Sequence, residues 1–435
     1  MGQIPPVIER APGDGRPAPV GSVRRDARRR LWRIGLLAVW GPGLIVMLAD
    51  TDAGSFVTAA QSGSRFGYAL VLPQLALIPV LYLAQEMTIR LGVVTGKGHG
   101  QLIRERFGAG WAYVSAGTLA ASAVGALVTE FAGVAGVGEL FGVSRWVIVP
   151  TATVALIAVA FMRSYRRVER VGLAVGLAEL AFLPVMFLAH PAPRALVAGL
   201  GSLPLGRHGY LTLLAANVGA VIMPWMVFYQ QGAVIDKGLS IEDLPRERRD
   251  TAVGSVITQV VMVAVVVAMA ATVYRTHPGA TLATVAQIAG ALSRSLGRGT
   301  ARILVGASIL GAAMVAALVV SLAGAWGMSE VLGWRHSLNE GPSRTNARFY
   351  ATYVLAHVLG AVLVLASVDL VGLTVEVEVM NAFLLPVVLG FLLVLEARAL
   401  PPEHRMRGSR RAIATTLCVA VIAFGLYLIP VTLGL

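Results

Sequence analysis

Two carboxylates, Asp50 and Asp52, stand in the middle of a long apolar run near the N-terminus, between Gly41 and Ser55. An ionised carboxylate in the middle of a bilayer costs at least ~2.5–3.5 kcal/mol, so two of them need a compensating cation. An arginine on a neighbouring helix is the ordinary partner, but no other apolar run has one in its middle, since Arg90 falls near the end of its run. We therefore interpret the two carboxylates as ligands of a bound cation.

A second unusual segment, from Asn217 to Trp225, contains a proline directly after Met223. Pro224 removes a backbone hydrogen-bond donor and clashes with the preceding turn, which breaks a helix. Unwound backbone survives at membrane depth only where it is buried in protein or lines a cavity. A methionine is usually a core side chain, but beside such a break its thioether is a candidate ligand for the same cation, opposite Asp52.

The elements that position these residues are predicted to be membrane helices. Of the 435 residues, 56% are apolar and 14% are charged, and the mean hydropathy is +0.74. Soluble proteins have about 25% charged residues, so an ordinary cytosolic enzyme and a disordered scaffold are excluded. Windows of about 20 apolar residues, enough to span a bilayer, predict eleven spans: 34–63, 69–95, 111–141, 146–163, 171–190, 209–236, 251–275, 301–331, 347–367, 371–397 and 412–433.

The two breaks fall in the first and the sixth span, each of which begins a set of five helices. Interrupted helices at corresponding positions of two inverted halves are the best sequence indication of a transporter's substrate site. We predict an all-α polytopic membrane protein with one transmembrane domain, 34–433, built of inverted repeats of about 34–190 and 209–397 and an extra helix, 412–433. Residues 1–33 are polar and basic, and we expect them to form a disordered cytoplasmic tail that is retained.

The positive charges indicate topology. The net charge is +13, and 34 of the 36 basic residues are arginine. If the N-terminus is cytoplasmic, the tail and the loops on that side carry 27 of them and the opposite loops carry 8. The positive-inside rule therefore predicts a cytoplasmic N-terminus and an outside C-terminus. The Arg-rich composition is typical of a GC-rich genome, and we expect the plasma membrane of a bacterium. No aromatic residues interleave with the basic ones, so we expect no nucleic-acid partner.

Other chemistries find no support in the sequence. The single cysteine, Cys418, excludes a disulfide framework and a cysteine-based zinc site. The absence of a Gly-x-x-x-x-Gly-Lys-Ser loop argues against ATP-driven pumping, and no His-Glu-x-x-His or Ser-His-Asp arrangement suggests a protease. We expect no enzyme activity, no cofactor and no obligate protein partner. The expected partners are the transported cation and the lipid bilayer.

Six regions resemble a known family. They are Gly41–Gly63 in the first span, Gln85-Glu86 with Thr95-Gly96 in the second, Thr129–Gly133 in the third, Tyr165–Arg170 after the fourth, Ala220–Pro224 in the sixth and Asn381–Pro386 in the tenth. Together they resemble the Nramp family, the natural resistance-associated macrophage proteins, over nearly everything from about residue 33 onward. The resemblance implies the leucine-transporter-like inverted-repeat fold and transport of a transition metal.

In this family an Asp-Pro-Gly-Asn segment and an Ala-x-x-Met-Pro-His segment bind the metal. The resemblance therefore implies that Asp52 and Met223 are side-chain ligands. It also implies the backbone carbonyls of Ala220 and Ala49 as ligands. Ser55 replaces the family's Asn, and its hydroxyl is still an oxygen donor, but a shorter one.

Two further departures concern protons. Trp225 replaces the family's sixth-helix His, and Gly133 stands where many members carry a second acid on the third helix. The resemblance associates those residues with proton movement, and their loss leaves Glu130 as the remaining third-helix carboxylate. We expect proton coupling to be weak or absent, with Glu130 and Trp225 as the candidate proton or gating residues.

Two acids add to the family's ligand pattern. Asp50 is an extra carboxylate, which favours hard ions such as Mg²⁺, whereas the thioether of Met223 favours softer ions such as Mn²⁺ or Fe²⁺. Glu378 falls near a position where family members offer a Gln to the occluded ion, so it is a candidate extra ligand. The alternative is that Glu376 and Glu378 both lie close to the outer surface and are solvated.

The remaining polar residues of the spans are interpreted as structural. Glu86 and Arg90 are four residues apart on the second helix, a spacing that predicts an ion pair near the cytoplasmic end. Glu179 and Gln259 are expected to make interior contacts and are assigned no role.

The sequence thus predicts a secondary transporter that moves a divalent metal cation, Mn²⁺/Fe²⁺-like or Mg²⁺, by alternating access. The alternative is a sodium- or proton-coupled carrier of a small organic substrate on the same fold. Such a carrier needs free half-helix N-termini for a substrate carboxylate, and Asp50 and Asp52 would repel that group.

Overall fold

The computed structural model describes residues 41–207, 209–367 and 369–432, and within these ranges the chain is helical and contains no β-strand. The predicted tail, 1–33, and the beginning of the first predicted span lie outside the described residues. The all-α prediction is confirmed for the rest of the chain.

Each of the eleven predicted spans coincides with one helix or with consecutive helices. The first five are α2 (Pro42–Asp50) with α3 (Ala53–Phe66), α4 (Val71–Ala76) with α5 (Ile78–Thr95), α7 (Ala109–Leu140), α8 (Arg145–Ala160), and α9 (Tyr165–Gly176) with α10 (Leu183–Leu188). The others are α12 (Tyr210–Val221) with α13 (Pro224–Asp236), α14 (Leu244–Met269), α16 (Arg298–Leu332), α17 (Ala347–Ala366), α18 (Leu370–Ala399) and α19 (Gly408–Thr432). Both predicted breaks are present, because the chain leaves the helix between α2 and α3 and between α12 and α13.

Three loop helices were not predicted, because each is shorter than the apolar windows used to find spans. They are α6 (His99–Phe107), α11 (Pro193–Leu200) and α15 (Val285–Leu296). Of these, α15 packs against α16 and α7, and α6 packs against α7.

By length and hydropathy, nine helical segments of the described chain are able to cross a membrane. The number is smaller than eleven for two reasons. The stretch Ala53–Thr95 counts once although it joins two predicted spans, and α8, Arg145–Ala160, is a shorter apolar helix. The chain is a multi-pass membrane protein.

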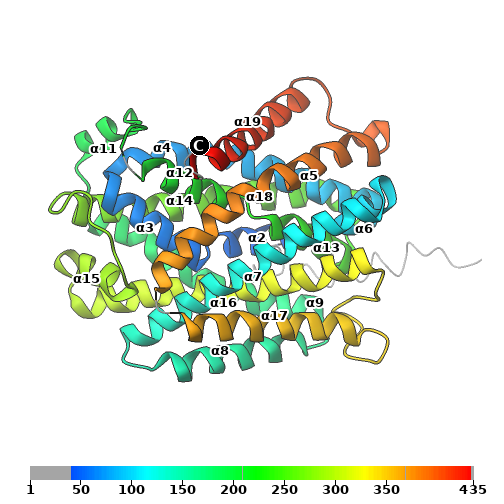
Figure 1. The fold of residues 1–435 in the computed structure, drawn as a ribbon, viewed down its shortest axis with the longest axis horizontal. Helices are drawn as coiled ribbons and strands as arrows, with labels where there is room; N and C mark the ends of the chain where they lie inside the picture. Colours follow the sequence, from blue (N-terminus) through cyan, green and yellow to red (C-terminus); the bar gives the residue numbers. More distant parts are fainter. Residues whose placement is uncertain (1–40, 208, 368, 433–435) are drawn as a thin grey trace, which may run out of the picture. The chain divides into compact units, whose positions relative to one another are not determined.

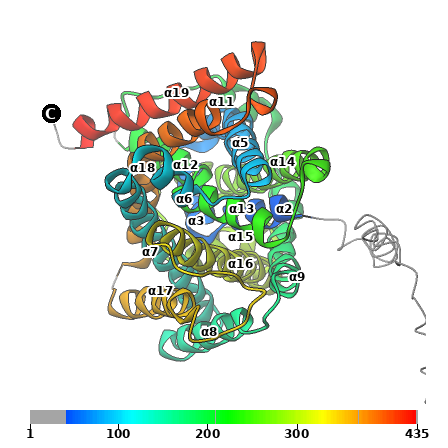
Figure 2. The same ribbon diagram turned by 90° about the vertical axis from the view of Figure 1, so that its right-hand side faces the viewer.

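The broken helices occupy the interior of the bundle. Figure 2 shows α2, α3 and α13 in the middle, with α7, α14, α16 and α18 around them and α8, α17 and α19 at the periphery. Burial follows the same order: 83% of the apolar window is buried in Tyr210–Asp236, but only 39% in α17 and 28% in Gly408–Leu428. Figure 1 shows α17 and α8 together along one side and α19 across the other. These outer helices expose large apolar side chains, such as Val154, Leu355 and Val419, as is expected of a surface in contact with lipid.

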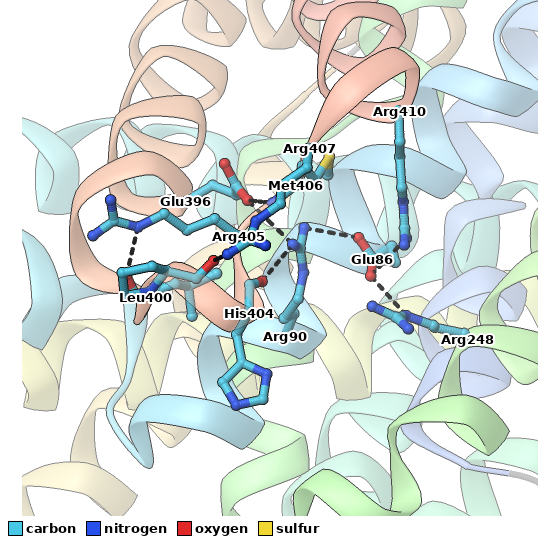
Figure 3. A network of polar contacts seen from close by, with 11 residues as sticks. Glu86, Arg90, Arg248, Glu396, Leu400, His404, Arg405, Met406, Arg407 and Arg410 are labelled. Atoms are coloured by element: carbon cyan, nitrogen blue, oxygen red, sulfur yellow. Dashed lines mark hydrogen bonds and ion pairs between the residues drawn. The ribbon is translucent and has the colours of Figure 1, made fainter.

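The predicted ion pair between Glu86 and Arg90 is confirmed, at 3.1 Å. It belongs to a larger cluster (Figure 3): Oε1 of the fully buried Glu86 also lies 2.8 Å from Arg248 of α14 and 2.7 Å from Arg410 of α19. Arg90 in turn pairs with Glu396 of α18 at 3.1 Å. The ion cluster therefore joins the ends of α5, α14, α18 and α19. These ends lie on one side of the membrane when successive spans alternate in direction.

Candidate metal site at two helix breaks

The first break consists of Thr51 and Asp52, between α2 and α3. Asp52 has an extended backbone (φ −63°, ψ 175°) and caps α3, because its Oδ1 accepts a hydrogen bond of 2.6 Å from the Ser55 amide. Such a cap satisfies an amide that the start of a helix leaves without a partner. Asp52 is fully buried, and its Oδ2 has no hydrogen-bond partner in the described part of the chain. One carboxylate oxygen is thus fixed by the helix, and the other is available to a cation.

The second break consists of Ile222 and Met223, between α12 and α13. Pro224 is the first residue of α13, where its missing N–H does no harm. Met223 is fully buried and has an extended backbone (φ −88°, ψ 139°). Trp225 donates an indole N–H to the Met223 sulfur at 3.2 Å. The residue that replaces the family's His therefore contacts the predicted thioether ligand.

A serine hydroxyl connects the two breaks. Ser55 Oγ lies 3.0 Å from the carbonyl oxygen of Ala220 and 2.9 Å from that of Asp50. A hydroxyl carries one proton, so it donates to one of these carbonyls at a time. Both carbonyls belong to the last turn of a helix, as does that of the buried Ala49, and such carbonyls have no continuing helix to bond to. Oxygen donors from both breaks therefore gather around Ser55.

The third helix supplies a second cap for α3. Glu130 of α7 is fully buried, and its Oε2 accepts a hydrogen bond of 3.1 Å from the Ala53 amide. Its Oε1 lies 3.2 Å from the hydroxyl of Thr129, whose single proton is donated either to this oxygen or to the Ala126 carbonyl at 2.8 Å. Glu130 and Asp52 thus accept hydrogen bonds from two amides, those of Ala53 and Ser55, at the same helix start. Gly133, one turn further along α7, lies so close to α3 that a Cβ there would collide with Ala53.

Glu376 and Glu378 of α18 have different surroundings. Glu376 is exposed, whereas Glu378 is fully buried and lies close to α3, because a Cβ added at Gly54 would collide with its Oε1. Its Oε2 accepts a hydrogen bond of 3.1 Å from Asn381, and Oε1 has no hydrogen-bond partner among the described residues. Gly219 of α12 permits an equally close approach to the Glu378 carbonyl. The expectation that both glutamates are solvated therefore does not fit Glu378, which is buried.

Asp50 contacts a different neighbour from the other predicted ligands. Its Oδ2 lies 3.4 Å from the side-chain amide of Gln259 on α14, which accepts a hydrogen bond from Gln74 at 2.6 Å. The adjacent hydroxyls of Thr51 and Thr258 also contact each other. Both carboxylate oxygens of Glu179, fully buried between α9 and α10, have no hydrogen-bond partner in the described ranges. Sequence reasoning noticed Glu179 as a polar residue in an apolar run but gave it no role.

A cavity of about 120 Å³ reaches the surroundings of this site from one end of the bundle. Thr129, Val57 and Gly133 line it beside the site, and Glu139 and Asp369 line it as well. Glu139 is exposed near the end of α7 and is a third-helix acid that the sequence analysis did not consider. The cavity reaches the neighbours of Glu130 and Ala53, whereas Asp52 itself stays fully buried.

The donors at the breaks are mixed in kind. Among the described residues, no group of three or more His, Cys, Asp or Glu side chains is arranged to hold a metal. The arrangement instead offers carboxylate, hydroxyl and carbonyl oxygens with one thioether. Oxygen ligands suit hard ions such as Mg²⁺, and the thioether suits softer first-row ions.

The sequence of the chain matches a known protein family. The family model described as "Natural resistance-associated macrophage protein-like" matches residues 43–430. A divalent metal cation transporter MntH of Burkholderia ambifaria is 26% identical over 416 residues, which cover 92% of this chain and 90% of the relative. One of Chromohalobacter salexigens is 30% identical over 301 residues, 66% of this chain and 69% of the relative.

Solved structures show the same fold. A manganese transporter of Eremococcus coleocola superposes with a TM-score of 0.73 at 18% identity, covering 91% of this chain and 86% of that one. A Na⁺-coupled sialic acid symporter reaches a TM-score of 0.60 at 14% identity, covering 88% of each chain. The predicted leucine-transporter-like fold is confirmed, and it is shared by carriers of metals and of organic molecules.

The contact between Gly54 and Glu378 leads to a prediction. Gly54→Ala should displace the Glu378 carboxylate, and overpacked interiors typically lose about 1–3 kcal/mol of stability. We expect a lower melting temperature of the purified protein and a loss of its transport activity. Gly117→Ala is the matched control, because a Cβ at this exposed helical glycine meets nothing within 4 Å. Unchanged stability and activity in Gly54→Ala would show that Glu378 of α18 does not pack closely against Gly54 of α3.

Proposed function

The chain belongs to the natural resistance-associated macrophage protein-like family, and from this premise we propose that it is a secondary transporter that carries a divalent metal cation by alternating access. The two relatives from Burkholderia ambifaria and Chromohalobacter salexigens are named divalent metal cation transporters, and the structure from Eremococcus coleocola is that of a manganese transporter. The single observation that carries the proposal is the contact of the two helix breaks through Ser55 and Ala220, beside the unpartnered oxygen of Asp52.

The charge of the interior supports a cation as the substrate. Apart from Glu86, five carboxylates of the described residues are at most 1% exposed, those of Asp50, Asp52, Glu130, Glu179 and Glu378. In the part of the chain that the structure describes, no basic side chain forms an ion pair with any of them. Buried charges need a partner, and a divalent cation neutralises two carboxylates at once.

The alternative, a carrier of a small organic substrate, is less compatible with the first break. Carriers of that kind use the free amides of a half-helix to bind the substrate carboxylate. Here those amides at the start of α3 already bind Asp52, at 2.6 Å, and Glu130, at 3.1 Å. A substrate carboxylate would have to displace two negative groups, so the likeness to the sialic acid symporter concerns the fold alone.

We infer the ligands by combining the family pattern with these contacts. Asp52, Met223, Ser55 and the carbonyls of Ala220 and Ala49 form the core of the proposed metal site. Asp50 and Glu378 are proposed as additional acids, which would favour Mg²⁺ over Mn²⁺ and Fe²⁺. The carboxylate of Glu378 supports this role because one oxygen is unpartnered and lies against Gly54.

We further propose that the protein lies in a bacterial plasma membrane with its N-terminus in the cytoplasm, as the arginine distribution indicates. The ion cluster around Glu86 supports one common side for the ends of α5, α14, α18 and α19. A cysteine introduced at the exposed Glu105, in a Cys418→Ser background, should react with an impermeant maleimide only after cells are opened.

Asp52→Asn is the sharpest test of the metal site. Asn is also a good helix cap, so the substitution keeps α3 but removes the charge. We expect at least about 100-fold weaker metal binding, or roughly 2.8 kcal/mol, measured by calorimetry on folded protein, and no uptake into proteoliposomes. Glu376→Gln removes an equal charge from the exposed face of α18 and should change neither. Wild-type uptake by a folded Asp52→Asn protein would contradict the assignment of Asp52 as a metal ligand.

A second prediction concerns selectivity. If the sulfur of Met223 binds the ion, Met223→Ala should weaken Mn²⁺ and Cd²⁺ binding far more than Mg²⁺ binding, because only the softer ions gain from sulfur. Met226→Ala, a fully buried methionine in the next turn, is the control for lost core volume. Titration of the three ions against both variants separates the roles. An equal loss for all three ions in Met223→Ala would mean that the side chain packs but does not bind.

A third prediction is that proton coupling is weak or absent. A relay normally uses a chain of intramembrane Asp, Glu and His residues, and Trp225 supplies only an N–H donor, which it directs to Met223. The membrane potential alone can drive the ion, since each charge gains about 2.3 kcal/mol per 100 mV. Metal uptake into proteoliposomes at a fixed potential should therefore cause little internal acidification.

The experiment uses a pH-sensitive dye inside the vesicles. The test variants are Glu130→Gln and Glu378→Gln, which remove the buried carboxylates that approach Ala53 and Gly54 from α7 and α18. Acidification that tracks metal uptake in the wild type, and that disappears in either variant while metal uptake continues, would establish a relay through that residue and contradict the prediction.

A further inference from the structure

A second cavity lies far from the helix breaks, between α5, α18 and α19, and has a volume of about 290 Å³. Its walls are mostly apolar and include Met87, Leu393 and Ala414. Two arginines, Arg398 near the end of α18 and Arg411 near the start of α19, also line it. The cavity therefore combines an apolar wall with positive charge at the ends of two membrane helices.

The two arginine side chains are open to a ligand. Both residues are exposed, and among the described residues neither guanidinium forms an ion pair or a hydrogen bond. The one acid of the cavity, Glu396, is already bound: its Oε1 lies 3.1 Å from Arg90 and accepts the Met406 amide at 2.5 Å. The cavity thus has two uncompensated positive charges and an acid whose charge is neutralised.

The position on α19 adds to this preference for an anion. Arg411, Ala414 and Thr415 lie in the first two turns of this long helix, whose N-terminal end carries a partial positive charge. Thr415 is exposed and contributes a hydroxyl donor. Beyond the cavity, α19 presents exposed apolar side chains, Ile413 at 53% and Val419 at 49% exposure.

We propose that this cavity binds the headgroup of an anionic phospholipid. Arg398 and Arg411 bind the phosphate, for which the guanidinium group has a matching fork of donors. The acyl chains extend along the exposed apolar faces of α18 and α19. A soluble phosphate would gain the charge contacts but not the apolar wall, which is why the occupant is a lipid. The site does not depend on which ion the protein carries.

A ligand in this cavity would contact residues that are connected to the ion cluster around Glu86. Glu396, which lines the cavity, accepts a hydrogen bond from the amide of Met406 and pairs with Arg90, the partner of Glu86 (Figure 3). The cluster joins the ends of α5, α14, α18 and α19. A bound anionic lipid should therefore raise the thermal stability of the whole bundle and not only order the loop between α18 and α19.

The test uses the full chain, delipidated in detergent. Binding of phosphatidylglycerol and of phosphatidylcholine is measured by native mass spectrometry, and the melting temperature is measured with each lipid. We expect preferential binding and stabilisation by phosphatidylglycerol, and about tenfold or greater weakening in Arg398→Gln/Arg411→Gln, given the contribution of each basic residue near an anionic lipid. The control, Arg166→Gln/Arg344→Gln, removes two exposed arginines elsewhere and should bind like the wild type.

Three outcomes would overturn the proposal. They are equal binding of both lipids, an equal loss in the control double variant, and equal stabilisation by inorganic phosphate or glycerol phosphate. If the double variant does not fold, the single variants Arg398→Gln and Arg411→Gln replace it. Each should then weaken phosphatidylglycerol binding about threefold or more, and wild-type binding by both would reject the site.

Discussion

The amides at the start of α3 lie deep inside a membrane protein, and the rest of the site depends on how they are satisfied. Within a bilayer no water replaces a missing hydrogen bond. Two carboxylates perform this task, Asp52 from the break itself and Glu130 from α7. Because these groups are anionic, the same interaction that permits the break also fills it with negative charge. A break that is stable only with buried carboxylates is thereby suited to a cation.

Much of the fold was predictable from the sequence because each membrane helix requires a long run of apolar residues. Apolar runs of sufficient length located every span, and the Asp50–Asp52 and Met223–Pro224 anomalies located both breaks. The short loop helices were missed, since a helix of nine to twelve residues such as α6 or α15 has no comparable apolar signal. Their contacts with α7 and α16 are tertiary, and local sequence does not encode them.

The sequence suggested which residues form the proposed site, but it did not indicate their contacts. The family pattern named Asp52, Met223 and Glu130, yet nothing in the sequence indicates that Glu130 bonds the Ala53 amide, 77 residues away. The glutamates of α18 illustrate the same limit. They are only two residues apart, yet Glu376 is exposed and Glu378 is buried. Which of them faces inward depends on the close approach of α3 and α12, through Gly54 and Gly219, and that approach is a property of the assembled bundle.

The hydrogen bond between the Trp225 indole and the Met223 sulfur has an optical consequence. An ion bound by this sulfur, as proposed above, would draw electron density from the acceptor of the indole N–H and would place a charge beside the ring. Indole emission responds to both changes, in wavelength and in quantum yield. Trp225 is therefore an intrinsic fluorophore at the proposed metal site, and its emission offers a signal of ion occupancy that needs no attached dye.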